Sequence, residues 1–356
     1  MNIKYEYNRK LYLKSFFEGD AVYFETALPL EGEEIKLLYP IKKIISITDY
    51  SLKKHYQEGK DFIVKDGKLI ILKDGNIPIM KLDQYYVDEG NQYNILINKD
   101  ASFYKFDKVK YIAYGEQDFL TKHQIAICYI HEDKWNGYRN APQREKLVRF
   151  LNKLKKKEKI TMLFFGDSIT VGCNSSGTEY GGNVPPFAES WPVMIHRYLE
   201  EKYQIKINYV NTAVGGTNSD WAKETYKENV MKYKPDILFL AFGMNDGGMS
   251  KEHHLENIME IINGCKKDNL NLEVVLISTT IPNIETDWYV FGNQEAYIEA
   301  YNTINLPYVA ICNMTHIEKD ILKRKRFKDI SGNNINHPND FLARVYAQAI
   351  LDVIGE

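Results

Sequence analysis

The residues best suited to chemistry in this chain of 356 residues lie around Ser168. An apolar run from Thr161 to Phe165 is followed by Gly166, Asp167 and Ser168, which indicates a buried parallel strand that ends in a sharp turn. Ligands bind at the carboxyl ends of the strands in an open α/β sheet. The Ser168 hydroxyl is therefore a candidate nucleophile. The alternative is that Asp167 and Ser168 only cap the helix that follows.

Two further apolar stretches end in polar turns that contain glycine. Residues 207–211 lead to Gly216, and residues 236–242 lead to Asn245. Acyl transfer requires a nucleophile, a base and hydrogen-bond donors aimed at the developing oxyanion. If the three strands are neighbours, the backbone N–H groups of Ser168 and Gly216 and the side-chain amide of Asn245 can form that oxyanion hole.

The base that this chemistry needs is best supplied by His337, which precedes the last helical segment. A structural histidine in a helix-entry loop is the alternative for this residue taken alone. Asp167 and Asp246 neighbour the candidate residues, and we expect them to brace the turns through backbone hydrogen bonds. Cys173 follows Ser168 closely, but it lies inside a helical segment and has no paired histidine, which disfavours a thiol nucleophile.

The elements that would position these residues alternate between strands and helices. This order predicts βαβ units and a doubly wound parallel sheet with helices on both faces. The expected strands are residues 161–165, 207–211, 236–242, 273–278 and 308–312. The expected helices are residues 145–157, 191–203, 220–232, 254–267, 295–303 and 341–354.

The part before this sheet has a different pattern, with short apolar pulses separated by turn residues. The pulses are residues 21–26, 34–38, 43–47, 61–65, 68–72, 93–97, 102–106 and 123–129. Asp66 and Gly67 between two of them are a hairpin signal. We expect an all-β sandwich, jelly-roll-like, over residues 1–140, with a substrate-binding or a structural role, and the α/β domain over residues 141–356.

Composition excludes several classes of function. The net charge of −2 gives no electrostatic case for nucleic acid. No apolar run approaches the roughly 20 residues that span a bilayer, and the first residues lack the pattern of a secretory signal. The four cysteines show no metal spacing, and the pair His253 and His254 is expected at an exposed helix start. We expect a cytoplasmic protein without membrane contact, metal or cofactor; its oligomeric state is left open.

The four blocks described above resemble those of SGNH (GDSL-type) hydrolases. Gly166-Asp-Ser-Ile169, the Gly216 turn, Gly243-Met-Asn-Asp246 and the late His337-Pro338 occur in the family's order, from about Ile160 to the C-terminus. The resemblance implies a flavodoxin-like sheet, Ser168 as nucleophile and His337 as base. It also implies that the Ser168 and Gly216 N–H groups and the Asn245 amide form the oxyanion hole.

One position departs from the family pattern. The family usually places an aspartate three residues before the histidine, where it orients the imidazole and stabilises its cation. Asn334 stands there in this chain. We expect a Ser–His dyad whose histidine is oriented by a backbone carbonyl or by the Asn334 side chain. The alternative is that Asp340 takes the role, although its place suits a helix N-terminus.

A β-sandwich before such a domain, without the orienting aspartate, is similar to acetyl-xylan-esterase-like carbohydrate esterases. This resemblance implies a serine esterase that removes short acyl groups, above all O-acetyl, from an oligosaccharide or other small carbohydrate ester. Trp191 and Trp288 could stack on sugar rings or serve as packing residues. The alternatives are a lipase or thioesterase for longer acyl chains, and a carbohydrate-binding protein without catalysis.

Overall fold

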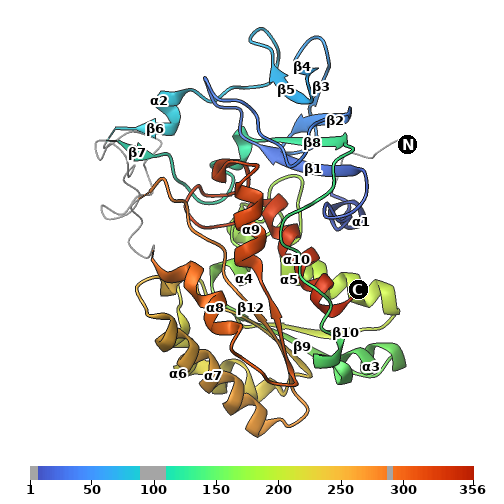
Figure 1. Cartoon of the computed structure of the whole chain (residues 1–356), viewed down its shortest axis with the longest axis vertical. Coiled ribbons are helices and arrows are strands. Elements are labelled where there is room, and N and C mark those ends of the chain that lie inside the picture. The colour runs from blue at the N-terminus through green and yellow to red at the C-terminus, as the bar shows by residue number, and fades with distance from the viewer. Residues whose placement is uncertain (1–6, 89–109, 287–291) are drawn as a thin grey trace.

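The computed structural model describes residues 7–88, 110–286 and 292–356. Figure 1 shows an antiparallel β-region, formed by the first part of the chain, above a parallel sheet that is flanked by helices. The chain returns to the β-region at its end, because the last helix runs beneath the first strand. The contact between the two parts therefore includes β1, near the start of the chain, and α10, at its end.

The parallel sheet has the strand order β10-β9-β11-β12-β13, which is the doubly wound order 2-1-3-4-5. Its strands are β9 (Ile160–Gly166), β10 (Ile207–Asn211), β11 (Ile237–Ala241), β12 (Glu273–Ile277) and β13 (Val309–Cys312). The predicted flavodoxin-like sheet is confirmed. Since β10, β9 and β11 are neighbours, the three polar turns that follow them lie along one edge.

Helices cover both faces of this sheet because successive strand residues point to opposite sides. Leu163 and Phe165 pack in a core with α6 (Ser219–Asn229), α7 (Lys251–Asp268) and α8 (Tyr297–Tyr301). Met162 and Phe164 lie in the opposite core, together with residues of five helices. These are α3 (Val148–Lys156), α4 (Ser168–Val171), α5 (Trp191–Tyr203), α9 (Met314–Leu322) and α10 (Asp340–Ile354).

Short 3-10 helices punctuate the connections. They are Thr121–His123, Arg144–Lys146, Glu179–Gly181, Met231–Tyr233, Met244–Asp246, Asn293–Ala296 and Phe327–Asp329. Several predicted helices are therefore shorter than expected, with a separate 3-10 turn at one end. The helix α9 was not expected from the sequence pattern.

The β-region is antiparallel, as predicted. Its main sheet has the order β1-β8-β2-β3, formed by Ala21–Ala27, Ile125–Ile130, Lys43–Asp49 and His55–Tyr56. Two smaller pairs are β4 (Phe62–Lys65) with β5 (Lys68–Ile71), and β6 (Tyr86–Val87) with β7 (Tyr111–Ile112). The short helices α1 (Arg9–Tyr12) and α2 (Leu82–Tyr85) complete it.

Individual strand predictions differ in outcome. The Asp66–Gly67 hairpin is confirmed, since Lys65 pairs with Lys68 and both turn residues have a positive φ. The strand expected at residues 34–38 is wrong, because the structure assigns no strand to that segment. Residues 93–97 and 102–106 lie outside the described residues. The jelly-roll arrangement remains a prediction.

The two parts of the chain share one hydrophobic core. It joins β-region residues such as Ile47 and Ile127 to Phe341 and Val345 of α10. The predicted boundary near residue 140 falls between β8 and α3, and the division into two domains remains a prediction. This continuous core fixes the β-region against the helix that follows His337.

Candidate active site

Ser168 is the first residue of α4 (Ser168–Val171), two residues after the end of β9, an interior strand of the sheet. Asp167 caps this turn, because its Oδ1 accepts the Ile169 N–H at 2.9 Å. Gly166 is required here, since a Cβ at this position would lie 2.2 Å from Thr170 Oγ1 and 2.4 Å from the Ala241 carbonyl oxygen. The tight turn thus presents the serine at the carboxyl edge of the sheet.

The structure brings the predicted oxyanion residues to the same edge. A Cβ placed on Gly215 would lie 3.7 Å from Ser168 Cβ, so the β10 turn adjoins the serine. Gly216 has φ +76° and open space where a side chain would be. The Asn245 amide donates one hydrogen bond to the Thr217 carbonyl oxygen at 2.9 Å, which ties the β11 turn to the β10 turn.

His337 lies against the serine, with its Nε2 atom 2.9 Å from Ser168 Oγ. The loop that carries it is shaped by Asn333, whose Oδ1 accepts backbone N–H groups of Ile335, Asn336 and His337, each at 3.0 Å. The nucleophile and base expected from the sequence are therefore within hydrogen-bond distance.

The opposite nitrogen of His337 contacts two residues that the sequence analysis did not select. Its Nδ1 atom lies 2.8 Å from Asn174 Oδ1 and 3.1 Å from Glu116 Oε2. Asn174 follows α4, whereas Glu116 belongs to the segment between β7 and β8 of the β-region. The expected Ser–His dyad without an acidic neighbour is thus not what the structure shows.

Neither residue expected to orient His337 faces its ring. Asn334 accepts the Tyr85 hydroxyl at 3.1 Å and donates to the Ala113 carbonyl oxygen at 3.0 Å, so its side chain is turned to the β-region. Asp340 accepts the Ser176 N–H at 2.8 Å and the Ser176 hydroxyl at 2.7 Å. The prediction that Asn334 orients the imidazole is corrected, because its polar atoms are used elsewhere.

The Glu116 carboxyl group is surrounded by donors. Its Oε1 accepts the Tyr114 hydroxyl at 2.9 Å and the Asn333 amide at 3.0 Å. Burial alone would raise the pKa of this carboxyl group, but the charge and hydrogen bond of His337, with the Asn333 and Tyr114 bonds, lower it to about 2. Glu116 is therefore an anion throughout the neutral pH range.

Two buried aspartates brace the turns, as the sequence suggested. Burial raises the pKa of Asp167 to about 7, partly offset by backbone hydrogen bonds from Ile169 and Met244. Asp246 Oδ1 accepts the Ser219 N–H at 2.9 Å and lies 3.1 Å from His254 Nδ1. His254 is fully buried, which corrects the expectation of an exposed pair; His253 is the exposed member.

Other sequence candidates have structural roles. Trp191 is 1% exposed, and its indole N–H donates to the Ile169 carbonyl oxygen at 2.9 Å, so it supports the serine turn rather than a sugar. Trp288 lies outside the described residues. Burial, with the charges of Glu116 and Asp167, raises the pKa of Cys173 to about 12, which disfavours a thiolate nucleophile.

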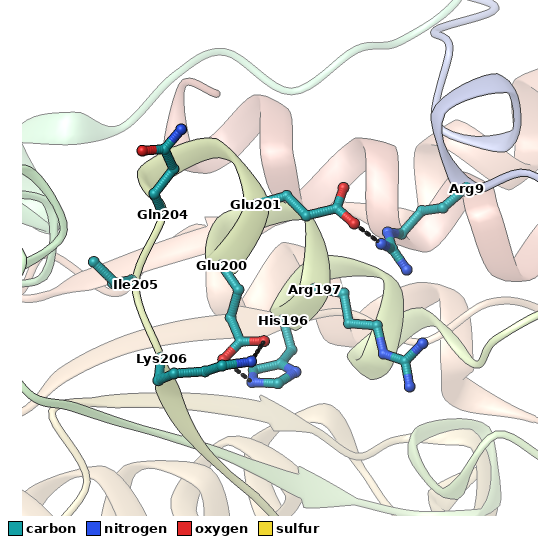
Figure 2. Close-up of a pocket in the computed structure, with 8 residues that line it drawn as sticks. All are labelled: Arg9, His196, Arg197, Glu200, Glu201, Gln204, Ile205 and Lys206. Atoms are coloured by element: carbon teal, nitrogen blue, oxygen red, sulfur yellow. Dashed lines mark hydrogen bonds and ion pairs between the residues drawn. The ribbon is translucent and has the colours of Figure 1, made fainter.

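A large hollow away from Ser168 opens on the outer side of α5 (Figure 2). Most of its charged side chains pair with one another: Arg9 with Glu201, and both His196 and Lys206 with Glu200. Arg197 pairs with Glu189. None of the predicted catalytic residues lines it. We therefore place the candidate site at the sheet edge and not in this hollow.

Within residues 7–88, 110–286 and 292–356, no group of three or more histidine, cysteine, aspartate or glutamate side chains is arranged to hold a metal ion. In the same ranges, no helix combines the length and the apolar character needed to cross a membrane.

Comparison with known proteins identifies the α/β part. Residues 164–340 match the GDSL-like lipase/acylhydrolase family. A curated relative, the uncharacterized lipoprotein YqeF of Bacillus subtilis (strain 168), is 28% identical over 129 residues, which cover 34% of this chain and 48% of the relative. The chain thus spans about half the length of this relative.

Two groups of solved structures resemble the chain in part. The acetylxylan esterase Axe2 of Geobacillus stearothermophilus has 17% identity and a TM-score of 0.46, over 57% of this chain and 97% of its own. A two-domain esterase active on acetylated mannans has 22% identity and a TM-score of 0.49, over 60% of this chain and 53% of its own. The family match extends from within β9 to the start of α10.

Proposed function

We propose that this chain, whose residues 164–340 form a GDSL-like lipase/acylhydrolase domain, is a carboxylic-ester hydrolase that works through an acyl-enzyme on Ser168. The contact between Ser168 Oγ and His337 Nε2 at 2.9 Å carries the proposal. A histidine at this distance can take the serine proton as the oxygen attacks an ester carbonyl. The alcohol then leaves with a proton from His337.

Oxyanion stabilisation is the second element of this mechanism. The Ser168 and Gly216 N–H groups and the Asn245 amide are the proposed donors to the tetrahedral intermediate. One Asn245 hydrogen is already committed to the Thr217 carbonyl oxygen, which leaves the other to face the substrate. Water then attacks the acyl-enzyme, again with His337 as base, and the carboxylic acid leaves.

A short acyl group, above all acetyl, is the proposed acid half of the ester. The residues that follow the serine turn are polar, with Asn174 and Ser176 engaged in hydrogen bonds.

A carbohydrate alcohol is the proposed other half of the ester. The insertion between α4 and α5 exposes two aromatic rings, Tyr180 at 59% and Phe187 at 51%. Exposed rings of this kind provide flat apolar faces on which the C–H face of a sugar ring can pack. They replace the buried Trp191 as the aromatic candidates for substrate contact in the described part of this insertion.

The test is the hydrolysis of nitrophenyl acetate, butyrate and octanoate by the wild type, Ser168→Ala and the control Ser51→Ala. We expect acetate to be preferred, Ser168→Ala to be inactive and Ser51→Ala to match the wild type. Acetylated xylo- and manno-oligosaccharides, followed by released acetate, are the next substrates. A preference for octanoate would favour a lipase or thioesterase. Oligosaccharide binding without any turnover would favour a non-catalytic binding protein.

A further inference from the structure

The position of Glu116 is unusual for a residue that touches a candidate catalytic histidine. It precedes Ser168 in the chain and belongs to the β-region, 221 residues from His337 in sequence. Its Oε2 atom lies 3.1 Å from His337 Nδ1, on the opposite side of the ring from the serine. This is the place that an orienting carboxylate occupies in a serine–histidine–acid triad.

The neighbouring groups define the protonation of the ring. Asn174 Nδ2 donates to the Gln117 carbonyl oxygen at 2.9 Å, so its Oδ1 is the atom that faces His337. An amide oxygen and a carboxylate only accept hydrogen bonds, and therefore Nδ1 must carry the proton. The lone pair of Nε2 is then directed at the Ser168 hydroxyl, which is the arrangement that a general base requires.

The Glu116 carboxylate is held in place from both parts of the chain. Tyr114 in its own segment and Asn333 in the histidine loop donate to its Oε1 atom, which leaves Oε2 for the imidazole. The flanking backbone is also fixed: the Ala113 and Gln117 carbonyl oxygens accept the amides of Asn334 and Asn174. The segment that carries Glu116 is thus bonded to the hydrolase part on both sides of this residue.

We propose that Glu116 is the acidic positioning residue of His337, so that the working site is a Ser168–His337–Glu116 triad assembled from both parts of the chain. The inference rests on the proposed esterase function. It assigns to the β-region a part in the reaction itself, in addition to any role in substrate binding. Asn174 Oδ1 is a second, neutral acceptor for the Nδ1–H of His337. This bond holds the ring but supplies no charge.

Because Glu116 supplies the negative charge at Nδ1, its removal should destabilise the imidazolium that forms as His337 takes the serine proton. The loss should therefore fall on kcat and not on KM.

The experiment compares Glu116→Gln, Glu116→Asp and the exposed control Glu132→Gln in the full chain with nitrophenyl acetate. We expect Glu116→Gln to lose about 10²-fold or more in kcat, with KM changed far less. Glu116→Asp should recover part of the rate, and Glu132→Gln should match the wild type. Thermal unfolding of each variant separates these effects from a loss of folding.

Two results would overturn the inference: a Glu116→Gln rate within about twofold of the wild type, or a loss confined to KM. If the wild type hydrolyses no ester, the proposed function fails separately. The rate at which a fluorophosphonate labels Ser168 then tests the pair. We expect Glu116→Gln to be labelled far more slowly, and equal labelling rates would again overturn the inference.

Discussion

Asn245 is the proposed oxyanion donor whose side chain can be removed without altering the backbone. Its bond to the Thr217 carbonyl oxygen at 2.9 Å orients the amide before substrate arrives. We expect Asn245→Ala to lower kcat by ~10²–10³ with little change in KM, because the lost bond forms fully only in the transition state. Steady-state kinetics would check this, with the exposed Asn208→Ala as control. An effect on KM alone would contradict the assignment.

Asn334 offers a contrasting test at the position where the family usually has an aspartate. Its amide donates to the Ala113 carbonyl oxygen at 3.0 Å, and a carboxylate there would face that oxygen without a proton to share. We expect Asn334→Asp to gain no activity and to lose about 1–3 kcal/mol of stability. Urea unfolding and kcat measure the two effects, with Asn208→Asp as control. A faster enzyme would show that the family position still works.

His337 and Glu116 differ in whether the sequence alone could identify them. His337 was predicted because a loop, a proline and a helix follow a recognisable local order. Glu116 is one of 48 acidic residues and contacts the histidine only through the tertiary fold. One indirect sign was present in the sequence. Because Asn334 stands where the family usually has an aspartate, a carboxylate beside His337 had to come from elsewhere in the chain.

At the scale of elements, the serine turn depends on the absence of a side chain at Gly166. A methyl group there would approach Thr170 Oγ1 and the Ala241 carbonyl oxygen far below contact distance. We expect Gly166→Ala to cost about 1–3 kcal/mol or more and to displace Ser168, with lower kcat. Thermal unfolding would measure the loss. Gly248→Ala is the control, because nothing lies within 4 Å of its added Cβ, and equal stability of both variants would contradict the argument.

The same elements differ in how far sequence predicted them. The helix α5 has the predicted bounds of 191 and 203, since its apolar periodicity is regular and Gln204 ends it in the left-handed region. Residues 34–38 have a similar apolar pulse but no partner strand. Pairing is a tertiary property, and propensity alone does not determine it. The helix α9 was missed although it begins after Asn313, a favoured N-cap residue whose side chain accepts the His316 N–H at 2.9 Å.

At the scale of the whole molecule, buried carboxyl groups should control how stability depends on pH. Burial raises the pKa of Glu318 in α9 to about 8, with the nearby Glu295 adding to the shift and the Ile281 N–H opposing it. A proton is then held in the folded but not the unfolded chain between pH ~4.3 and about 8. The contribution of Glu318 to stability should therefore be greatest below that window and fall as pH rises through it, by at most ~1.4 kcal/mol per unit.

The variant Glu318→Gln cannot take up this proton on folding, but its side-chain oxygen can still accept the Ile281 N–H. We expect its stability to fall less steeply between pH 5 and 8 than that of the wild type, as measured by urea unfolding. Some slope should remain, because burial also raises the pKa of Asp167 to about 7 and of Asp340 to about 6. An unchanged slope would contradict the argument, and the exposed Glu224→Gln is the control.

The hydrogen bonds on both sides of Glu116 have a consequence for how such a protein can evolve. If the residues of a triad come from two parts of a chain, the first part cannot have been added by simple fusion and kept as a dispensable domain. Under the proposed triad, any recombination that separates the segment around Glu116 from the loop around His337 leaves only the neutral Asn174 at Nδ1. Such a triad ties the two parts together in inheritance.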